Sequence, residues 1–176
     1  MADVSAFSGG APATPTIAVV GCGNLHRGDD GVGPQVLQGL ASRAVCTDSR
    51  VRLLDAGTDG MAVMFAARGC RTLIIVDACT SGSDPGAVFE VPGAEIEQRH
   101  QPSFTLHDFR WDHALFAGRR IFGEAFPKDV TVLLIEIGTV AFGVGLSPCV
   151  MDAAAKVADR VEALVRSRLL EERATQ

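Results

Sequence analysis

The sequence predicts an α/β fold in which a doubly wound, mainly parallel sheet carries helices on both of its faces. Three apolar runs have the length of buried strands, at residues 17–20, 72–76 and 130–135. Their successive apolar residues are typical of parallel strands that are covered on both sides. Segments with apolar residues at helical spacing lie between and after these runs. Such an alternation of strands and helices is the pattern of a doubly wound sheet.

The first strand, at residues 17–20, leads through a glycine-rich turn at 21–31 into a helix. The apolar residues of this helix recur at helical spacing and therefore share one face: Val32, Val36, Leu37 and Leu40. We expect Asp29 or Asp30 to cap the helix, because a carboxylate at that position can accept hydrogen bonds from free N–H groups. Pro34 is compatible with the first turn of the helix.

The middle of the chain continues the alternation. A strand at 51–54 and a short helix from about 60 to 68 precede the run at 72–76. That run is predicted to be a central strand, because its apolar residues follow one another without alternation. Residues 87–91 are more mixed and have a Pro-Gly pair on each side, which favours a short edge strand.

The C-terminal part begins with a helix from about 108 to 122, followed by the strand at 130–135. Ser147 followed by Pro148 predicts the start of a long helix. The sequence thus predicts one domain over residues 17–172, preceded by a flexible tail at 1–16. The tail lacks the basic start and the apolar stretch of a signal peptide.

Composition narrows the function classes. A net charge of −5 without a basic cluster argues against a nucleic-acid partner. The longest apolar runs are too short to span a membrane. The cysteines are odd in number and scattered, which indicates reduced thiols in a cytoplasm rather than disulfides or a zinc site. They are Cys22, Cys46, Cys70, Cys79 and Cys149.

Acidic residues follow three of the predicted strands: Asp30, Asp77 and Glu136. Ligands of open α/β sheets bind beyond the carboxyl ends of the strands, where the strand order reverses. We expect Asp30 and Asp77 to share one site there. A carboxylate directly after the apolar run at 72–76 would be partly buried, which is costly unless it is paired or bound to a metal.

An imidazole could join these two carboxylates. His107 precedes the helix expected from about 108 and could overhang the strand ends, whereas His113 would lie within that helix and is expected to be structural. Two carboxylates and an imidazole suit a divalent metal of the first transition row. Such a metal can polarise a carbonyl and lower the pKa of bound water. Cys79 is expected to be an inert thiol, since no histidine is placed to activate it.

A nucleotide site is the alternative suggested by the glycine-rich turn. A dinucleotide fingerprint needs a third glycine three residues after Gly23, but His26 stands there and the next glycine is Gly28. Asp55 could still imitate the acid that binds the ribose. The sequence contains no Gly-Lys-Ser/Thr of a P-loop and no Gly-x-Ser-x-Gly of a serine hydrolase.

The pattern Gly21-x-Gly23-Asn24-x-x-x-Gly28-Asp29-Asp30-Gly31-x-Gly33 resembles the signature of the hydrogenase maturation proteases. Shorter matches follow in the order of that family: Val76-Asp77-Ala78, Pro85-Gly86, Leu106-His107, Ile135-Glu136-Ile137 and Gly145-Leu146-Ser147-Pro148. The resemblance covers nearly all of the chain after the tail. It implies a three-layer α/β/α sandwich around a mostly parallel, twisted sheet of about five strands, with one short antiparallel edge strand.

The resemblance also implies a function. Family members are endopeptidases that remove the C-terminal extension from the precursor of a nickel–iron hydrogenase large subunit. Carried over by motif, the catalytic and metal-contacting residues are Asp30, Asp77 and His107. No cofactor would be bound permanently, because nickel would arrive with the precursor. The protein is expected to be a cytoplasmic monomer with the nickel-loaded precursor as its partner.

Two other functions remain as alternatives. One is an NAD(P)-binding, Rossmann-like oxidoreductase, which the glycine-rich turn would serve. The other is a nickel-dependent maturation chaperone, which would bind the precursor through the same residues without cutting it.

Overall fold

The computed structural model describes residues 15–99 and 109–174. The predicted tail at 1–16 therefore lies almost wholly outside the described residues. The longer elements are β1 (Ile17–Cys22), α1 (Val32–Leu40), β2 (Val51–Gly57), α2 (Gly60–Ala67), β3 (Thr72–Cys79), β4 (Val88–Pro92), α3 (Gly93–Arg99), α4 (Trp111–Phe122), β5 (Asp129–Glu136) and α5 (Pro148–Ala174). Short 3-10 turns are η1 (Gly28–Gly31), η2 (Ala44–Thr47) and η4 (Gly123–Ala125).

The five strands form one sheet in the order β2-β1-β3-β5-β4. All neighbours are parallel except β4, which pairs antiparallel with β5 at the edge. The predicted mainly parallel sheet with a short edge strand is thereby confirmed. The chain moves from β1 to β2 on one side and then returns to β3 on the other side of β1. The strand order therefore reverses between β1 and β3.

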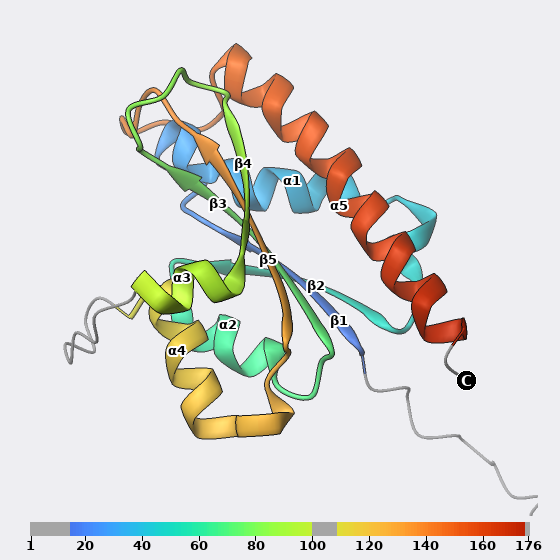
Figure 1. Ribbon diagram of the computed structural model, residues 1–176. Helices are drawn as coiled ribbons and strands as arrows, with labels where there is room; N and C mark the ends of the chain where they lie inside the picture. The colour runs from blue at the N-terminus through green and yellow to red at the C-terminus, as the bar shows by residue number, and fades with distance from the viewer. Residues whose placement is uncertain (1–14, 100–108, 175–176) are drawn as a thin grey trace, which may run out of the picture.

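Helices cover both faces of the sheet, as the sequence predicted (Figure 1). Helices α1 and α5 pack on one face, where Ile17, Val19 and Ile74 belong to their core. Helices α2 and α4 pack on the other face, where Ala18 and Ile75 point into a second core. Successive residues of a strand enter opposite cores, which is why the central strands have uninterrupted apolar sequences.

Three local features differ from the sequence-based expectations. The α3 helix was not predicted, because its first residue, Gly93, was taken as part of a turn. A Cβ at Gly93 would lie 2.5 Å from Val130 Cβ, so the glycine allows α3 to lie directly on β5. Strand β3 continues to Cys79, so Asp77 lies within the strand rather than just beyond it. Helix α4 begins at Trp111, later than the expected start near 108.

The expected cap of α1 was wrong. The N-cap residue is Gly31, and no side chain caps this helix. Asp29 and Asp30 instead form part of the turn η1. Both carboxylates are used elsewhere, as the next section describes.

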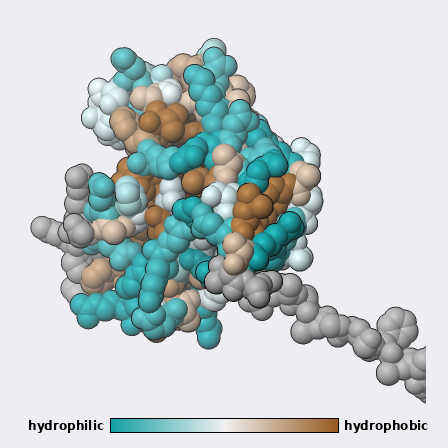
Figure 2. Space-filling model, turned by 45° about the vertical axis from the view of Figure 1, so that its right-hand side comes forward, coloured by the Kyte–Doolittle hydropathy of each residue, from teal (hydrophilic) through white to brown (hydrophobic). Residues whose placement is uncertain are grey.

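The surface is mostly hydrophilic on the face that Figure 2 shows, with apolar residues in separate small areas. Among the described residues, no helix is both long enough and apolar enough to cross a membrane.

Candidate functional site

Asp30 is held at the end of β1 by a tight turn. Its Oδ2 accepts a hydrogen bond of 3.0 Å from the backbone N–H of Asn24. Gly23 makes this closure possible: its φ is +127°, and a Cβ there would collide with the carbonyl oxygen of Asp30. Asp30 is half-buried. The local sequence thus fixes the carboxylate beside the carboxyl end of β1.

Asp77 lies near the carboxyl end of β3 and is 5% exposed. Its Oδ1 accepts from the N–H of Ala78 at 2.8 Å, and its Oδ2 accepts from the indole N–H of Trp111 at 2.5 Å. Burial raises the pKa of Asp77 above its ordinary value, and the negative charge of Asp30 adds to this rise. The hydrogen bonds from Trp111 and Ala78 and the charge of Arg110 oppose it. Asp77 is therefore a carboxylate that gains from any further cation.

The two carboxylates meet in one pocket, which we call the Asp77 hollow, as the sequence predicted for Asp30 and Asp77. It has a volume of about 180 Å³ and lies at the reversal point between β1 and β3. Its other lining residues include Cys22, Gly57, Thr58, Asp59, Arg110 and Trp111. A second, adjoining hollow of about 360 Å³ shares Asp30, Arg110 and Trp111 and extends to Val140.

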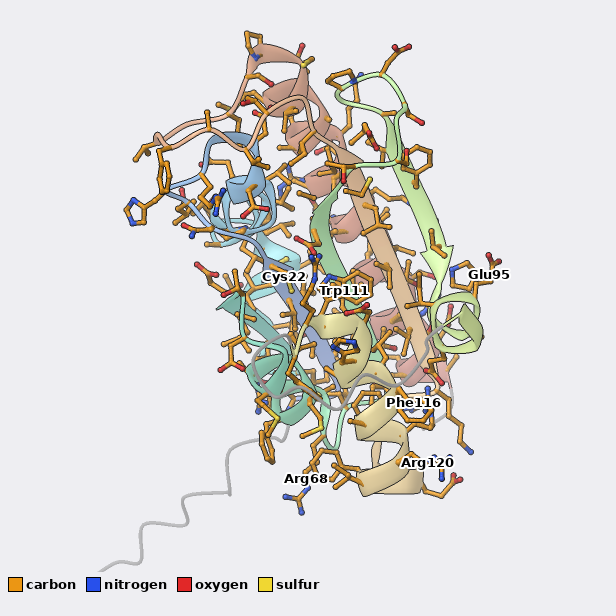
Figure 3. The ribbon with its side chains drawn as sticks, turned by 90° about the vertical axis from the view of Figure 1, so that its left-hand side faces the viewer. Cys22, Arg68, Glu95, Trp111, Phe116 and Arg120 are labelled. Carbon is orange, nitrogen blue, oxygen red and sulfur yellow. The ribbon has the colours of Figure 1, made fainter. Side chains whose placement is uncertain are left out.

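Arg110 and Trp111 are members of this site that sequence reasoning missed. Figure 3 shows Trp111 at the start of α4, next to Cys22 at the end of β1. Arg110 Nη2 lies 3.7 Å from Asp77 Oδ2, the same oxygen that Trp111 contacts. A single tryptophan beside an arginine at a helix start was the available signal, but only the packing of α4 on β3 connects the pair to Asp77.

His107, the third predicted site residue, lies in the segment 100–108, outside the described residues. The structure therefore brings together two of the three. Within residues 15–99 and 109–174, no group of three His, Cys, Asp or Glu side chains is arranged to hold a metal ion. His113 accepts a hydrogen bond of 3.4 Å from the backbone N–H of Arg110, which is a structural contact at the start of α4.

Glu136, at the end of β5, anchors the loop that follows β3. Its carboxylate accepts from the N–H groups of Ser81 and Gly82 at 2.8–2.9 Å and from the Ser81 hydroxyl at 2.8 Å. The Cys79 thiol also donates to it at 3.3 Å. Burial, followed by this contact, raises the pKa of Cys79 to about 12. Cys79 is thus a protonated thiol, in agreement with its expected inertness.

Protonation of Glu136 at low pH should weaken the hydrogen bonds that anchor this loop. Hydrogen bonds, first of all from the Ser81 N–H, lower the pKa of Glu136 to about 2. A carboxylate with a depressed folded pKa stabilises the fold above its unfolded pKa of about 4.3, and this contribution is lost as pH falls towards the folded value. We expect Glu136→Gln to lower Tm at pH 7 and the difference from wild type to shrink between pH 4.5 and pH 2.5. Thermal unfolding followed by circular dichroism across this range measures the difference; a constant gap would contradict the assignment.

Asp29 performs a different structural task from its neighbour Asp30. It is 1% exposed and accepts from the N–H of Ser147 at 2.6 Å and from the Ser147 hydroxyl at 3.0 Å. A weaker bond of 3.4 Å comes from the N–H of Gly138. Asp29 therefore ties the turn after β1 to both ends of the loop that connects β5 with α5. Of the two adjacent acids, Asp30 alone lines the hollows.

A larger hollow, with a volume of about 630 Å³, lies at the opposite end of the sheet. Its charged lining includes Asp129 and Arg168, which are bonded to each other at 2.6 Å. The carboxylates of Asp30 and Asp77, at the reversal point of the strand order, are the better candidate for chemistry. They line the same hollow and both carry negative charge, but their hydrogen-bond donors differ: Asn24 for Asp30 and Trp111 for Asp77.

Comparison with known proteins identifies the family of the chain. A model of the hydrogenase maturation protease family matches residues 34–164. Over 138 residues the chain is 35% identical to the hydrogenase expression/formation protein HupD of Thiocapsa roseopersicina, a match that covers 76% of this chain and 60% of that protein. It is 29% identical to the hydrogenase 2 maturation protease of Escherichia coli, over 76% of this chain and 80% of that protein.

The fold is also similar to a solved structure, that of the hydrogenase maturating endopeptidase HybD from Escherichia coli. The two share 25% sequence identity and superpose with a TM-score of 0.73. The superposition covers 86% of this chain and 93% of the other.

Proposed function

The chain belongs to the hydrogenase maturation protease family, and on that premise we propose that it is an endopeptidase that removes the C-terminal extension of a nickel–iron hydrogenase large-subunit precursor after nickel insertion. The observation that carries this proposal is the convergence of Asp30 and Asp77 on one hollow at the reversal point of the sheet. Membership of the family suggests the substrate class, and the hollow that Asp30 and Asp77 share supports them as the residues that act on it.

The mechanism we propose treats nickel as part of the substrate. Nickel held by the precursor would enter the Asp77 hollow and be contacted by Asp30, Asp77 and the predicted ligand His107. Asp77 suits this role because it is buried beside a second carboxylate, so a cation relieves both its desolvation and the like-charge repulsion. With the precursor fixed in this way, a carboxylate can take the proton of a water that attacks the scissile carbonyl. Trp111 would keep Asp77 in one orientation throughout.

A cytoplasmic, monomeric protein without a permanently bound cofactor is part of the same proposal. All five cysteines are free thiols, which supports a reducing compartment. The NAD(P) alternative has less support, because His26 stands where a dinucleotide fingerprint needs its third glycine.

The test is precursor trimming with and without nickel. Purified protein is incubated with nickel-loaded and with metal-free precursor, and mass spectrometry follows the loss of the C-terminal extension. We expect cleavage of the loaded precursor only. Equal cleavage of both would reject nickel recognition, while binding without any mass change would favour the chaperone alternative.

The loop between β5 and α5 offers a surface for the precursor polypeptide. Phe142 is 88% exposed, Val144 is 82% exposed, and Val140 reaches from this loop into the adjoining hollow that contains Asp30. Exposed apolar residues next to a site that receives a protein substrate favour contact with that substrate. We expect Phe142→Ser to raise KM for precursor trimming about tenfold, as loss of an interface hot spot does, with little change in kcat.

The matched control for this change is Ile121→Ser. Ile121 is also largely exposed, at 64%, but it lies near the end of α4 and lines neither hollow. Its substitution should leave KM unchanged. Equal effects of the two substitutions would show that surface hydrophobicity in general, rather than this loop, governs precursor binding.

A further inference from the structure

Arg110 is the one cationic side chain among the described residues that line the Asp77 hollow and its neighbour. Its guanidinium lies 3.7 Å from Asp77 Oδ2, and Arg110 lines both hollows. The Arg110 side chain is 66% exposed, whereas that of Asp77 is 7% exposed. A largely exposed cation thus lies beside a buried carboxylate.

Trp111 and Arg110 contact the same oxygen of Asp77 in different ways. The indole of Trp111 is 8% exposed and donates a short hydrogen bond, so it fixes the carboxylate. The Arg110 contact is longer than a hydrogen bond and mostly in water, and ion pairs of this kind are weak. The hydrogen bond from Trp111 to Asp77 is therefore expected to persist, whereas Arg110 can be displaced from Asp77.

The acidic residues that line the Asp77 hollow give a displaceable cation such as Arg110 a role. Three acids line this hollow, and Asp59 among them caps the start of α2, where its Oδ1 accepts from the N–H groups of Met61 and Ala62. Asp30 and Asp77 are the two carboxylates that line the hollow from the ends of β1 and β3. Paired carboxylates without a counter-ion attract free divalent cations from solution. A guanidinium, which stays charged at all physiological pH values, repels such cations.

We propose that Arg110 is a specificity-determining residue, which occupies the cation position beside Asp77 in the free protein and yields it only to a metal delivered by a precursor. This inference rests on the proposed function. A free ion must displace Arg110 by its own affinity for the two carboxylates. A precursor-held ion is assisted by the polypeptide contacts around it. Arg110 therefore makes the free protein a poor metal binder, whereas the polypeptide contacts of a loaded precursor offset the cost of displacing Arg110.

The chain contains its own probe for this exchange. Trp111 is the sole tryptophan of the sequence, and it is hydrogen-bonded to Asp77. A paramagnetic Ni²⁺ ion bound by Asp77 would quench the fluorescence of this indole. Metal binding can thus be followed in the full-length protein without any precursor and without proteolysis.

The experiment titrates NiCl₂ into wild type, Arg110→Gln and Arg110→Lys, with Trp111 fluorescence and calorimetry as readouts. Removing the nearby positive charge should tighten Ni²⁺ binding by roughly tenfold or more in Arg110→Gln. Arg110→Lys keeps the charge and should bind as weakly as wild type. The double variant Arg110→Gln with Asp77→Asn should lose the gain.

Arg120→Gln is the matched control for net charge. Arg120 lies further along the same helix, where it stacks 5.4 Å above the Phe116 ring, and Figure 3 shows both away from Cys22 and Trp111. Its removal should not change the Ni²⁺ affinity. Circular dichroism confirms that each variant is folded before titration.

Equal Ni²⁺ affinity of wild type and Arg110→Gln would overturn the inference, as would equal affinity of the Gln and Lys variants or the lack of any binding by Arg110→Gln. Precursor trimming by the wild-type protein is measured in parallel. If trimming is nickel-dependent while the titrations fail, Arg110 has no such role and the proposed function stands. If trimming fails while the titrations behave as expected, the cation exchange stands without the protease assignment.

Discussion

Replacement of Asp77 by asparagine is expected to slow precursor trimming by about a thousandfold or more, which is the scale of losing a general base or a metal contact. The amide has the shape of the carboxylate, and its oxygen can still accept from the Trp111 indole or from Ala78. It lacks the negative charge that would bind nickel and accept a proton. The initial rate of trimming of the nickel-loaded precursor measures the effect.

The same substitution should not weaken the fold. Burial raises the pKa of Asp77, so its charged form costs stability at neutral pH. A group whose pKa is higher in the folded than in the unfolded state stabilises the fold at pH values below its unfolded pKa. This stabilisation is lost as the pH increases through the folded pKa. Asp77→Asn removes this cost, but its NH2 group then faces one of the two N–H donors, so we expect a Tm close to that of wild type at pH 7. Lost activity with little change in stability is the result expected of a functional residue.

Two further variants complete this test. Asp30→Asn should also lose trimming, because its carboxylate faces the same hollow. Asp159→Asn should trim normally, since Asp159 is a largely exposed acid on α5, paired with Arg43. Normal trimming by Asp77→Asn would remove the Asp77 hollow from the catalytic account.

The second large effect concerns the fold that places this site. Gly33, in the first turn of α1, lies against the backbone of both central strands. An added Cβ would collide with the carbonyl oxygen of Cys22 in β1 and would lie 2.6 Å from that of Val76 in β3. These are backbone atoms and cannot rotate away, so α1 would have to move off the sheet. We expect Gly33→Ala to destabilise the protein by about 3 kcal/mol or more, a large part of the total stability of a domain.

Gly39→Ala is the matched control in the same helix. A Cβ at Gly39 would lie 4.0 Å from Ala158 Cβ, which is an ordinary contact. Alanine has the higher helix propensity, so this variant should gain about 0.5–1 kcal/mol. Urea denaturation midpoints measure both changes. Similar midpoints for the two variants would contradict the close approach of α1 to the sheet.

The sequence was sufficient for the elements whose signals are local. Largely apolar runs identified β1, β3 and β5, because both faces of a central strand are buried. Ser147 and Pro148 marked the start of α5, which begins at Pro148. Helix α3 was missed because Gly93 is a turn residue by local rules, and its close approach to Val130 is a tertiary contact.

The candidate site likewise has one part that the sequence predicted and another that only the structure showed. The positions of Asp30 and Asp77 at two strand ends could be predicted from neighbouring residues, and the family pattern could be identified from the glycines and acids around them. The sequence alone did not show that Asp29 binds the start of α5 while Asp30 faces the hollow. Nor did it show the contacts of Arg110 and Trp111 with Asp77.

The locations of β1, β3 and β5 and the start of α5 were determined by the sequence itself, since hydrophobic periodicity and turn chemistry depend on residues close together in the chain. The order β2-β1-β3-β5-β4 and the partners of each carboxylate were decided only by the tertiary structure. The physical reason is that these features depend on contacts between distant segments, such as Asp77 with Trp111, whose free energy comes from the packing of the whole sheet and its helices.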